Sequence, residues 1–99
     1  MGLRIDLHRR AQQDLQDIKS YLVQHAGAQA AERVRLHLLG KIGRLANTPR
    51  MGRPTTNADI RILPPTRYPY RVYYAIARDF VIVLHIRHSA RRDPDLNSL

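Results

Sequence analysis

The sequence has 99 residues, no cysteine and a formal net charge of +9. A chain of this length holds one hydrophobic core, so we expect a single domain over residues 1–99, and the lack of cysteine excludes disulfides and thiolate chemistry. No apolar run approaches the roughly 20 residues of a membrane span and no signal-peptide pattern opens the chain, which predicts a cytoplasmic protein without membrane contact.

The basic residues are almost all arginines, since only Lys19 and Lys41 are lysines among the 17. The planar guanidinium fork pairs with phosphates and carboxylates, so this bias favours a polyanion or an acidic protein as the partner. A genome that encodes arginine in place of lysine would give the same composition. The charge is spread over both halves of the chain and marks no basic tail.

The first half of the chain predicts a short strand and two helices. Apolar and polar residues alternate from Leu3 to Leu7, which indicates a strand with one buried face. Apolar residues then recur at helical spacing over residues 9–25, with Gly27 as a C-cap, and again over residues 31–45. No favoured N-cap residue precedes the first helix. Because the link between the helices is short, they must pack antiparallel.

The second half predicts a long loop and three strands. Residues 47–57 form a polar loop rich in proline and glycine, and loops of this length in compact domains are often functional. Residues 60–62 alternate as a strand that the following proline pair ends. Residues 68–92 predict a β-hairpin that ends in a cluster of arginine and histidine.

The register of the hairpin follows from its apolar faces, because directly paired residues share a face. Joining the two apolar faces needs a three-residue connection over residues 77–79, which places Arg71 opposite His85. A two-residue loop would instead leave Arg71 unpaired in the core. With the longer connection, the core face of the hairpin carries Tyr70, Val72, Tyr74, Ile76, Phe80, Ile82, Leu84 and Ile86.

The predicted order is β-α-α-β-β-β, an α+β fold in which an antiparallel sheet packs against an N-terminal helical hairpin. The other face of the sheet is expected to stay open, and residues 88–99 are expected to fray. Matching the apolar faces places Arg61 on this open face. The basic and aromatic residues that gather there and at the exit of the hairpin are Arg61, Arg71, Tyr73, His85, Arg87, His88, Arg91 and Arg92.

The sequence holds no P-loop, dinucleotide fingerprint, metal-ligand spacing or serine-nucleophile elbow, so no cofactor and no metal are predicted. The arginine-rich face has three interpretations. It could hold an RNA phosphate, stack a base and move a proton, as a metal-independent endoribonuclease requires. It could be an ordinary polar face of a sheet. It could also dock an acidic peptide.

Several features of the sequence follow one another in a distinctive order. They are the opening strand with Ala11, Asp14, Leu15 and Ile18, the loop with Pro49, Met51, Gly52, Arg53 and Pro54, then Arg61, the segment 70–74, and the final strand 81–86 with His88, Arg91 and Arg92. In this order and spacing, over nearly the full length, the chain resembles the RelE/ParE superfamily of bacterial toxin–antitoxin toxins.

The resemblance implies one of two activities. RelE-like members cleave mRNA in the ribosomal A site, and ParE-like members inhibit DNA gyrase. The RelE-like pattern would imply Arg61, Arg71, His85 and Arg91 as catalytic residues. That pattern also uses lysines before the hairpin and commonly a tyrosine near the C-terminus, which this chain lacks. Because the proline-flanked loop and the helical hairpin are more ParE-like, we expect a gyrase-directed toxin, with a RelE-like endoribonuclease as the alternative.

The resemblance also implies the partners. Both branches are neutralised by an acidic antitoxin whose C-terminal segment wraps the toxin, so we expect a hetero-oligomer with a ParD-like antitoxin, which the +9 charge suits. The target is DNA gyrase, or the ribosome and mRNA in the alternative. The residues expected to contact the target or the antitoxin are Arg53, Arg61, Arg71, Tyr73, His85, Arg87, His88, Arg91 and Arg92.

Overall fold

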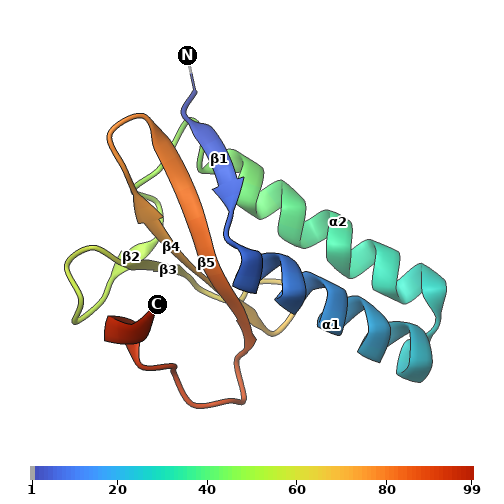
Figure 1. The fold of residues 1–99 in the computed structure, drawn as a ribbon. Coiled ribbons are helices and arrows are strands. Elements are labelled where there is room, and N and C mark those ends of the chain that lie inside the picture. Colours follow the sequence, from blue (N-terminus) through green and yellow to red (C-terminus); the bar gives the residue numbers. More distant parts are fainter. Residues whose placement is uncertain (1) are drawn as a thin grey trace.

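The computed structural model describes residues 2–99 and confirms the predicted order of elements, with one short strand added in the loop (Figure 1). A helical hairpin packs against one face of a sheet, and the C-terminal tail returns across the other face. The elements are β1 (Arg4–Leu7), α1 (Arg9–Ala26), α2 (Ala28–Arg44), β2 (Arg53–Pro54), β3 (Arg61–Leu63), β4 (Tyr70–Ile76), β5 (Phe80–His88) and the 3-10 helix η1 (Leu96–Ser98).

Both helices lie close to their predicted bounds. α1 has an N-cap that the sequence did not predict: His8 is extended, and its Nδ1 accepts a hydrogen bond from the backbone N–H of Arg10 at 3.1 Å. Gly27 ends α1 and precedes α2 with a φ of +94°, a conformation that favours glycine. This single-residue link turns the chain back, so the helices run antiparallel side by side.

The sheet contains five strands in the order β1-β5-β4-β3-β2. Neighbouring strands are antiparallel except β1, which lies parallel to β5. The α+β class is therefore confirmed, but the sheet is mixed and not wholly antiparallel. A parallel pair needs a long crossover connection, and the elements between β1 and β5 supply it.

The predicted three-residue connection between β4 and β5 is wrong, and the hairpin keeps neither register considered from the sequence over its whole length. Its turn is the two-residue loop over residues 78–79, closed by a backbone hydrogen bond of 2.8 Å. A β-bulge then leaves Leu84 unpaired, so the register beyond it shifts by one residue. Arg71 consequently lies opposite Arg87, and not opposite His85 as predicted. The bulge allows the short turn while it keeps the Arg71 side chain out of the core.

The bulge also exchanges the two faces of β5. Val81 and Val83 enter the main core before the bulge, and Ile86 enters it afterwards. The predicted core positions that instead lie on the other face are Phe80, Ile82 and Leu84. One extra residue reverses every later position, which simple alternation in the sequence cannot reveal.

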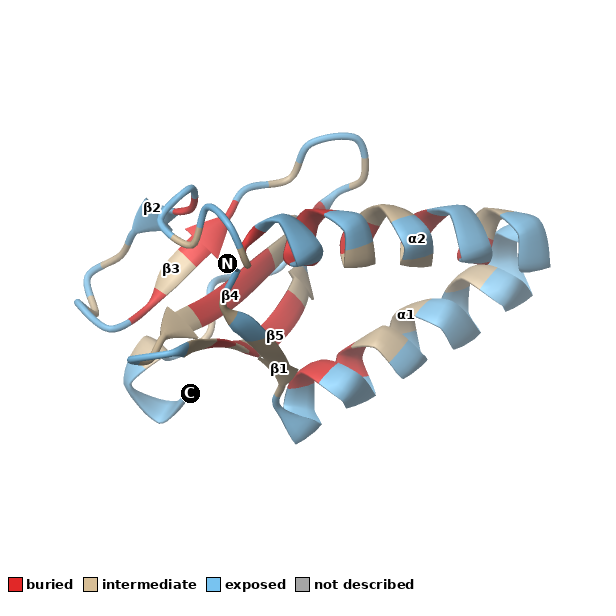
Figure 2. Cartoon of the chain, turned by 90° about the horizontal axis from the view of Figure 1, so that it is seen from above, coloured by how far each residue is buried: buried red, intermediate tan, exposed pale blue. Residues whose placement is uncertain are grey.

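The main core lies between the helical hairpin and the sheet. α2 presents a continuous buried stripe, whereas α1 is buried only at Ala11 and Asp14 (Figure 2). The buried residues of this core are Ala11, Val34, Leu38, Ile42, Leu45, Leu63, Tyr70, Val72, Tyr74, Val81, Val83 and Ile86. The rest of the apolar stripe of α1 is only half-buried, so part of it remains free to line a groove.

A smaller apolar cluster lies on the opposite face of the sheet. Ile60, Ile62 and Tyr73 form it, and Leu84 and Leu96 pack against it. Leu96 belongs to the tail, so residues 88–99, which were expected to fray, return to the sheet in the structure. The tail covers part of the face that was expected to be open.

Arg61 lies on the helix side of the sheet. It pairs with the core residue Tyr74, whereas its neighbour Ile62 pairs with Tyr73 on the other face. The expectation that Arg61 shares a face with Arg71 is therefore wrong. The error arises because Ile60 and Ile62 were assigned to the main core, whereas both belong to the smaller cluster.

Gly52 lies where the loop meets a buried tyrosine. The Tyr74 hydroxyl accepts a hydrogen bond from the Gly52 N–H at 2.9 Å and donates one to the Pro49 carbonyl oxygen at 2.7 Å. A Cβ at position 52 would lie 2.5 Å from this hydroxyl oxygen and 2.9 Å from the Ile62 carbonyl oxygen. We expect Gly52→Ala to lower the free energy of unfolding in urea by about 1–3 kcal/mol, because the loop must shift.

Gly40→Ala is the matched control. Gly40 lies in α2, and a Cβ there meets no atom within 4 Å. Replacing a glycine inside a helix with alanine stabilises the fold by about 0.5–1 kcal/mol. Equal effects of the two substitutions would contradict the close packing at Gly52.

Candidate functional site

Asp14 of α1 replaces a strand partner along the far half of β5. β1 pairs only with residues 80–83, and within residues 2–99 no strand continues along this edge of β5 beyond them. There the Asp14 Oδ2 accepts hydrogen bonds from the Ile86 N–H at 2.9 Å and from the His85 Nδ1 at 2.5 Å. The Arg10 Nε donates to Asp14 Oδ1 at 3.2 Å. One carboxylate thereby fixes α1 against β5 and satisfies a buried backbone donor.

His85 is buried and neutral. Burial lowers the pKa of its imidazole below the ordinary value of 6.5, and the charges of Arg10 and Arg87 act in the same direction, although Asp14 opposes them. A neutral ring that donates from Nδ1 to Asp14 can accept through Nε2, which lies 3.3 Å from Arg87 Nη1. The ring also stacks on Tyr73, with centroids 5.8 Å apart. His85 therefore positions its neighbours and is not open to solvent.

The lowered pKa of His85 predicts a loss of stability in mild acid. The unfolded state takes up a proton near pH 6.5 while the folded state resists it, so the contribution is complete above that pH and is lost as pH falls through the folded pKa. We expect the free energy of unfolding to decrease between pH 7 and pH 5. His85→Asn should flatten this dependence, whereas His25→Asn, on exposed helix surface, should leave it unchanged. An unchanged slope in His85→Asn would contradict the assignment.

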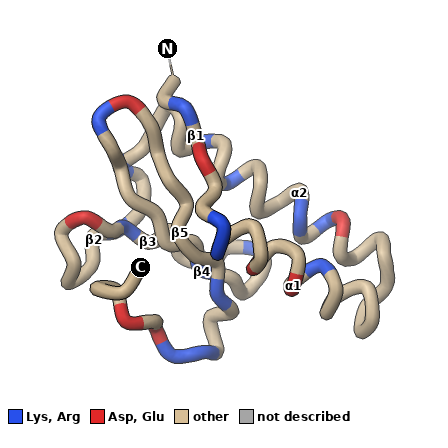
Figure 3. The backbone as a smooth tube through the Cα atoms, in the orientation of Figure 1, with Lys and Arg blue, Asp and Glu red and all other residues tan. Residues whose placement is uncertain are grey.

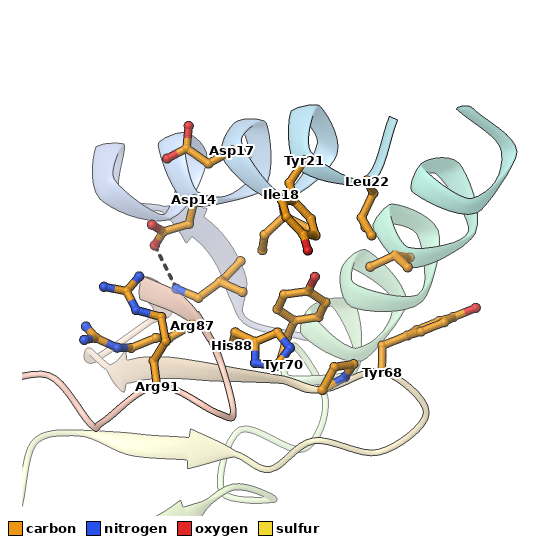
Figure 4. Close-up of a pocket in the computed structure, with 13 residues that line it drawn as sticks. Asp14, Asp17, Ile18, Tyr21, Leu22, Tyr68, Tyr70, Arg87, His88 and Arg91 are labelled. Atoms are coloured by element: carbon orange, nitrogen blue, oxygen red, sulfur yellow. Dashed lines mark hydrogen bonds between the residues drawn. The ribbon is translucent and has the colours of Figure 1, made fainter. Parts of the chain in front are cut away.

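A groove of about 440 Å³ lies between α1, the segment before β4 and the end of β5 (Figure 4). Its apolar lining includes Ile18, Tyr21, Leu22, Val34, Tyr70 and Ile86. Arg87 and Arg91 lie together at one end, near Asp14, and Tyr68 lies at the other. The groove is therefore an apolar channel with a cationic end.

The cations at this end are available to a partner. Within residues 2–99, neither Arg87 nor Arg91 forms an ion pair with a carboxylate, and the Arg87 Nε is buried without a hydrogen-bond partner. His88, exposed at the end of β5, also lines the groove and lies beside Tyr70 (Figure 4). An occupant with apolar side chains and a carboxylate would complement both the channel and its end.

Of the other predicted residues, Arg71 and Tyr73 pair with Arg87 and His85 across β4 and β5 and share their face, whereas Arg53, Arg61 and Arg92 lie elsewhere. The Arg61 Nη1 donates to the Gly52 carbonyl oxygen at 2.6 Å and so braces the loop. Arg53 is exposed on β2, at the far edge of the sheet, and Arg92 is exposed in the tail. Arg71 and Tyr73 share the second face of the sheet with the tail above them.

The four residues of the ribonuclease alternative are accordingly spread over different surroundings. Arg61 lies on the helix side and Arg71 on the opposite face, while the His85 ring is buried against Asp14. Arg91 is exposed beside the groove. They do not converge around one open pocket in which a phosphate could sit.

Two aspartates that the sequence did not mark as functional organise this region. Asp14 holds β5, and Asp93 accepts a hydrogen bond from the Tyr73 hydroxyl at 2.5 Å. For Asp14 a signal was present, because it lies at helical spacing between Ala11 and Ile18, within the apolar stripe, where an acidic residue is out of pattern. For Asp93 no periodic pattern exists in the tail.

Two further properties concern the residues that the structure describes. Among residues 2–99, no group of three or more histidine, cysteine, aspartate or glutamate side chains is arranged to hold a metal ion. Over the same range, neither helix combines the length and the hydropathy needed to cross a membrane.

Comparison with known families gives a decisive match. The family model for the ParE toxin of type II toxin–antitoxin systems, parDE, matches residues 5–93. The chain belongs to the ParE toxin family. The resemblance to the RelE/ParE superfamily is thereby confirmed, and the ParE-family chain is a toxin component of a type II toxin–antitoxin system. A comparison with curated proteins gives no match.

Solved structures share the fold of this ParE-family chain. A chain of the chromosomal ParDE toxin–antitoxin system of P. aeruginosa is 20% identical, with a TM-score of 0.81, and the alignment covers 88% of this chain and 96% of that one. The toxin–antitoxin complex RelBE2 of Mycobacterium tuberculosis gives 20% identity, a TM-score of 0.66 and coverage of 89% and 99%. The isolated RelE toxin of E. coli gives 18% identity, a TM-score of 0.66 and coverage of 93% and 89%.

Proposed function

We propose that this toxin arrests growth by acting on DNA gyrase, and that a cognate acidic antitoxin of the ParD type neutralises it. The observation that carries the proposal is the match of the ParE toxin family model to residues 5–93. The similarity to a chain of a ParDE system, at a TM-score of 0.81, supports the same branch. Gyrase and the antitoxin would meet the toxin in the cytoplasm.

The placement of the basic residues also favours an inhibitor over a ribonuclease. A metal-independent ribonuclease needs groups that hold the phosphate and transfer the proton within hydrogen-bond reach of one site. Here Arg61 and Arg71 lie on opposite faces of the sheet, and His85 is occupied by Asp14. A RelE-like mRNA endoribonuclease remains the alternative that the experiment below distinguishes.

The groove is our candidate for the antitoxin contact. Its apolar lining suits the buried side chains of a wrapped segment, and Arg87, His88 and Arg91 suit the carboxylates of an acidic partner. The +9 charge of the toxin would accelerate association with such a partner at low salt. The complex would be a hetero-oligomer. Arg53 and Arg92, which are exposed outside the groove, are left as candidate contacts for the target.

Inducible expression without antitoxin tests the proposal. Plasmid topology and total mRNA integrity are followed side by side in the arrested cells. Relaxed or cleaved plasmid with intact mRNA is the expected result. Truncated mRNA with normal topology would overturn the gyrase assignment and support the ribonuclease alternative, with Arg61, Arg71, His85 and Arg91 as the first residues to substitute.

A further inference from the structure

A second hollow, of about 460 Å³, and the groove lie at opposite ends of β4. The groove is lined at Tyr70, where β4 begins, and the second hollow at Ile76, where β4 ends. Three separate segments line the hollow, namely the loop before β2, the start of β3 and the turn between β4 and β5. Each of them contributes one arginine, and these are Arg50, Arg61 and Arg78. We call this site the arginine hollow.

The loop holds the Arg61 side chain in place. The Arg61 Nη1 donates to the Gly52 carbonyl oxygen at 2.6 Å and to the Arg50 carbonyl oxygen at 3.3 Å. The loop is itself fixed, because the Tyr74 hydroxyl accepts a hydrogen bond from the Gly52 N–H and donates one to the Pro49 carbonyl oxygen. Both acceptors of Arg61 are neutral, so the donors on its Nε and Nη2 and its positive charge remain for a ligand.

Arg50 and Arg78 extend this positive charge to the rim of the hollow. Both are exposed, and within residues 2–99 neither forms an ion pair with a carboxylate. Figure 3 shows a basic position at the turn of the β4 and β5 hairpin, the turn that contains Arg78. Burial raises the pKa of the Tyr74 hydroxyl, whereas the charges of Arg61 and Arg50 both lower it. These two guanidiniums therefore act on the same point beside the loop.

One carboxylate, that of Asp59, also lines the arginine hollow. Asp59 is exposed and forms no ion pair in the part of the chain that the structure describes. The three arginines thus outweigh a single acidic group, and none of them is neutralised by it. The hollow attracts an anion, and Asp59 weakens that attraction.

The remaining lining favours a backbone phosphate over a free nucleotide. Apart from the charged residues, the hollow is lined by Ala58, Ile76 and Ala77, and no aromatic side chain of residues 2–99 lines it. Sites for small molecules are mostly apolar and aromatic, and the bases of a single strand need aromatic rings on which to stack. Arginine forks, in contrast, match phosphate oxygens directly. The lining therefore suits a duplex, whose bases are already stacked on one another.

We propose that the arginine hollow binds the phosphate backbone of duplex DNA. The fixed guanidinium of Arg61 binds one phosphate, and Arg50 and Arg78 bind phosphates from the rim. Contacts of this kind position a protein on a duplex without reading its sequence. The choice of DNA rests on the proposed function, because gyrase acts on duplex DNA and the toxin would meet the two together. The site adds a contact with the nucleic acid to the proposed contact with the enzyme.

Binding of a short labelled DNA duplex to the purified toxin, without gyrase, tests the inference. Arg50→Ala/Arg78→Ala removes two positive charges from the hollow, and Lys19→Ala/Arg33→Ala removes two from exposed surface of the helical hairpin. All four side chains are exposed, so both variants should fold as the wild type does. By fluorescence anisotropy, we expect the first variant to bind about tenfold more weakly than wild type and the control to stay within about threefold.

The salt dependence separates phosphate contacts from general attraction to a basic protein. Each phosphate contact contributes roughly 0.9 to the slope of log affinity against log salt concentration. Arg50→Ala/Arg78→Ala should therefore lower the slope by about 2, and the control should leave it nearly unchanged. Equal losses of affinity or equal slopes in the two variants would overturn the site. Tighter binding of an RNA duplex of the same sequence would overturn the choice of DNA.

Asp59→Asn tests the same site in the opposite direction. Removing the carboxylate from the hollow should tighten duplex binding by about threefold, because the repulsion of the phosphates is lost. Asp17→Asn, which changes the charge equally on the exposed surface of α1, should have a smaller effect. A gain of affinity cannot come from a damaged fold. Equal affinities of Asp59→Asn and wild type would contradict the inference.

A supercoiling assay with the same variants separates this inference from the gyrase proposal. If the toxin inhibits gyrase while Arg50→Ala/Arg78→Ala binds the duplex as the control variant does, the DNA site is wrong and the gyrase proposal stands. If that variant loses duplex binding while the wild type leaves gyrase active, the DNA site stands and the gyrase proposal falls.

Discussion

Replacing Asp14 with alanine is expected to lower the free energy of unfolding by about 3–5 kcal/mol, among the largest effects of any single substitution in this toxin. The carboxylate accepts hydrogen bonds from the Ile86 N–H and from His85 Nδ1, and both donors are buried. Without Asp14 neither donor regains water, because α1 still covers the edge of β5. Urea denaturation followed by circular dichroism measures the change.

Asp17→Ala is the matched control for this prediction. Asp17 is exposed on the same helix, three residues further on, where it accepts a hydrogen bond from the exposed side chain of Gln13. Surface substitutions of this kind change stability by about 0.5 kcal/mol or less. If Asp14→Ala cost no more than Asp17→Ala, the carboxylate would not be the support of β5 that its contacts indicate.

Leu22→Glu is expected to abolish neutralisation by the antitoxin while the toxin still folds. Leu22 lines the groove and is only half-buried in the free chain. A partner seated in the groove would bury the new carboxylate among apolar side chains. We expect an affinity loss of at least 100-fold, about 2.7 kcal/mol or more, as for the central residues of other interfaces. Titration calorimetry with the cognate antitoxin measures the affinity, and growth on co-expression reports neutralisation.

Val23→Glu provides the comparison for this second prediction. Val23 is the next residue of α1 but lies outside the groove and is 43% exposed. Val23→Glu introduces the same charge into the same helix, so it controls for any general effect of an added carboxylate on a +9 protein. Unimpaired antitoxin binding by Leu22→Glu, or an equal loss with Val23→Glu, would remove the groove as the contact surface.

The helices could be predicted closely from the sequence because their apolar stripes are continuous. Every position of the predicted stripe in α2, from Ala31 to Leu45, is buried in the structure. The stripe of α1 follows the same period, yet most of it is half-buried. Periodicity reports which side of a helix is apolar, but not whether this chain or a partner covers it.

The register of the hairpin and the long-range contacts of the sheet could not be predicted from the sequence, for a different reason. The bulge at Leu84 adds one unpaired residue, and the same alternation then fits two registers equally well. The partner of Asp14 is more than 70 positions away along the chain, so no local pattern links it to His85. The tail docks through one leucine and one aspartate, too few residues to give a periodic signal.

The most direct test of the account is a supercoiling reaction with purified gyrase, relaxed plasmid and increasing amounts of the toxin. The destabilised variant Asp14→Ala serves as the negative control. A translating extract receives the same doses of toxin, so that mRNA cleavage is followed in parallel. The account predicts that the toxin blocks supercoiling while mRNA stays intact. Normal supercoiling at excess toxin, together with cut mRNA in the extract, would contradict it.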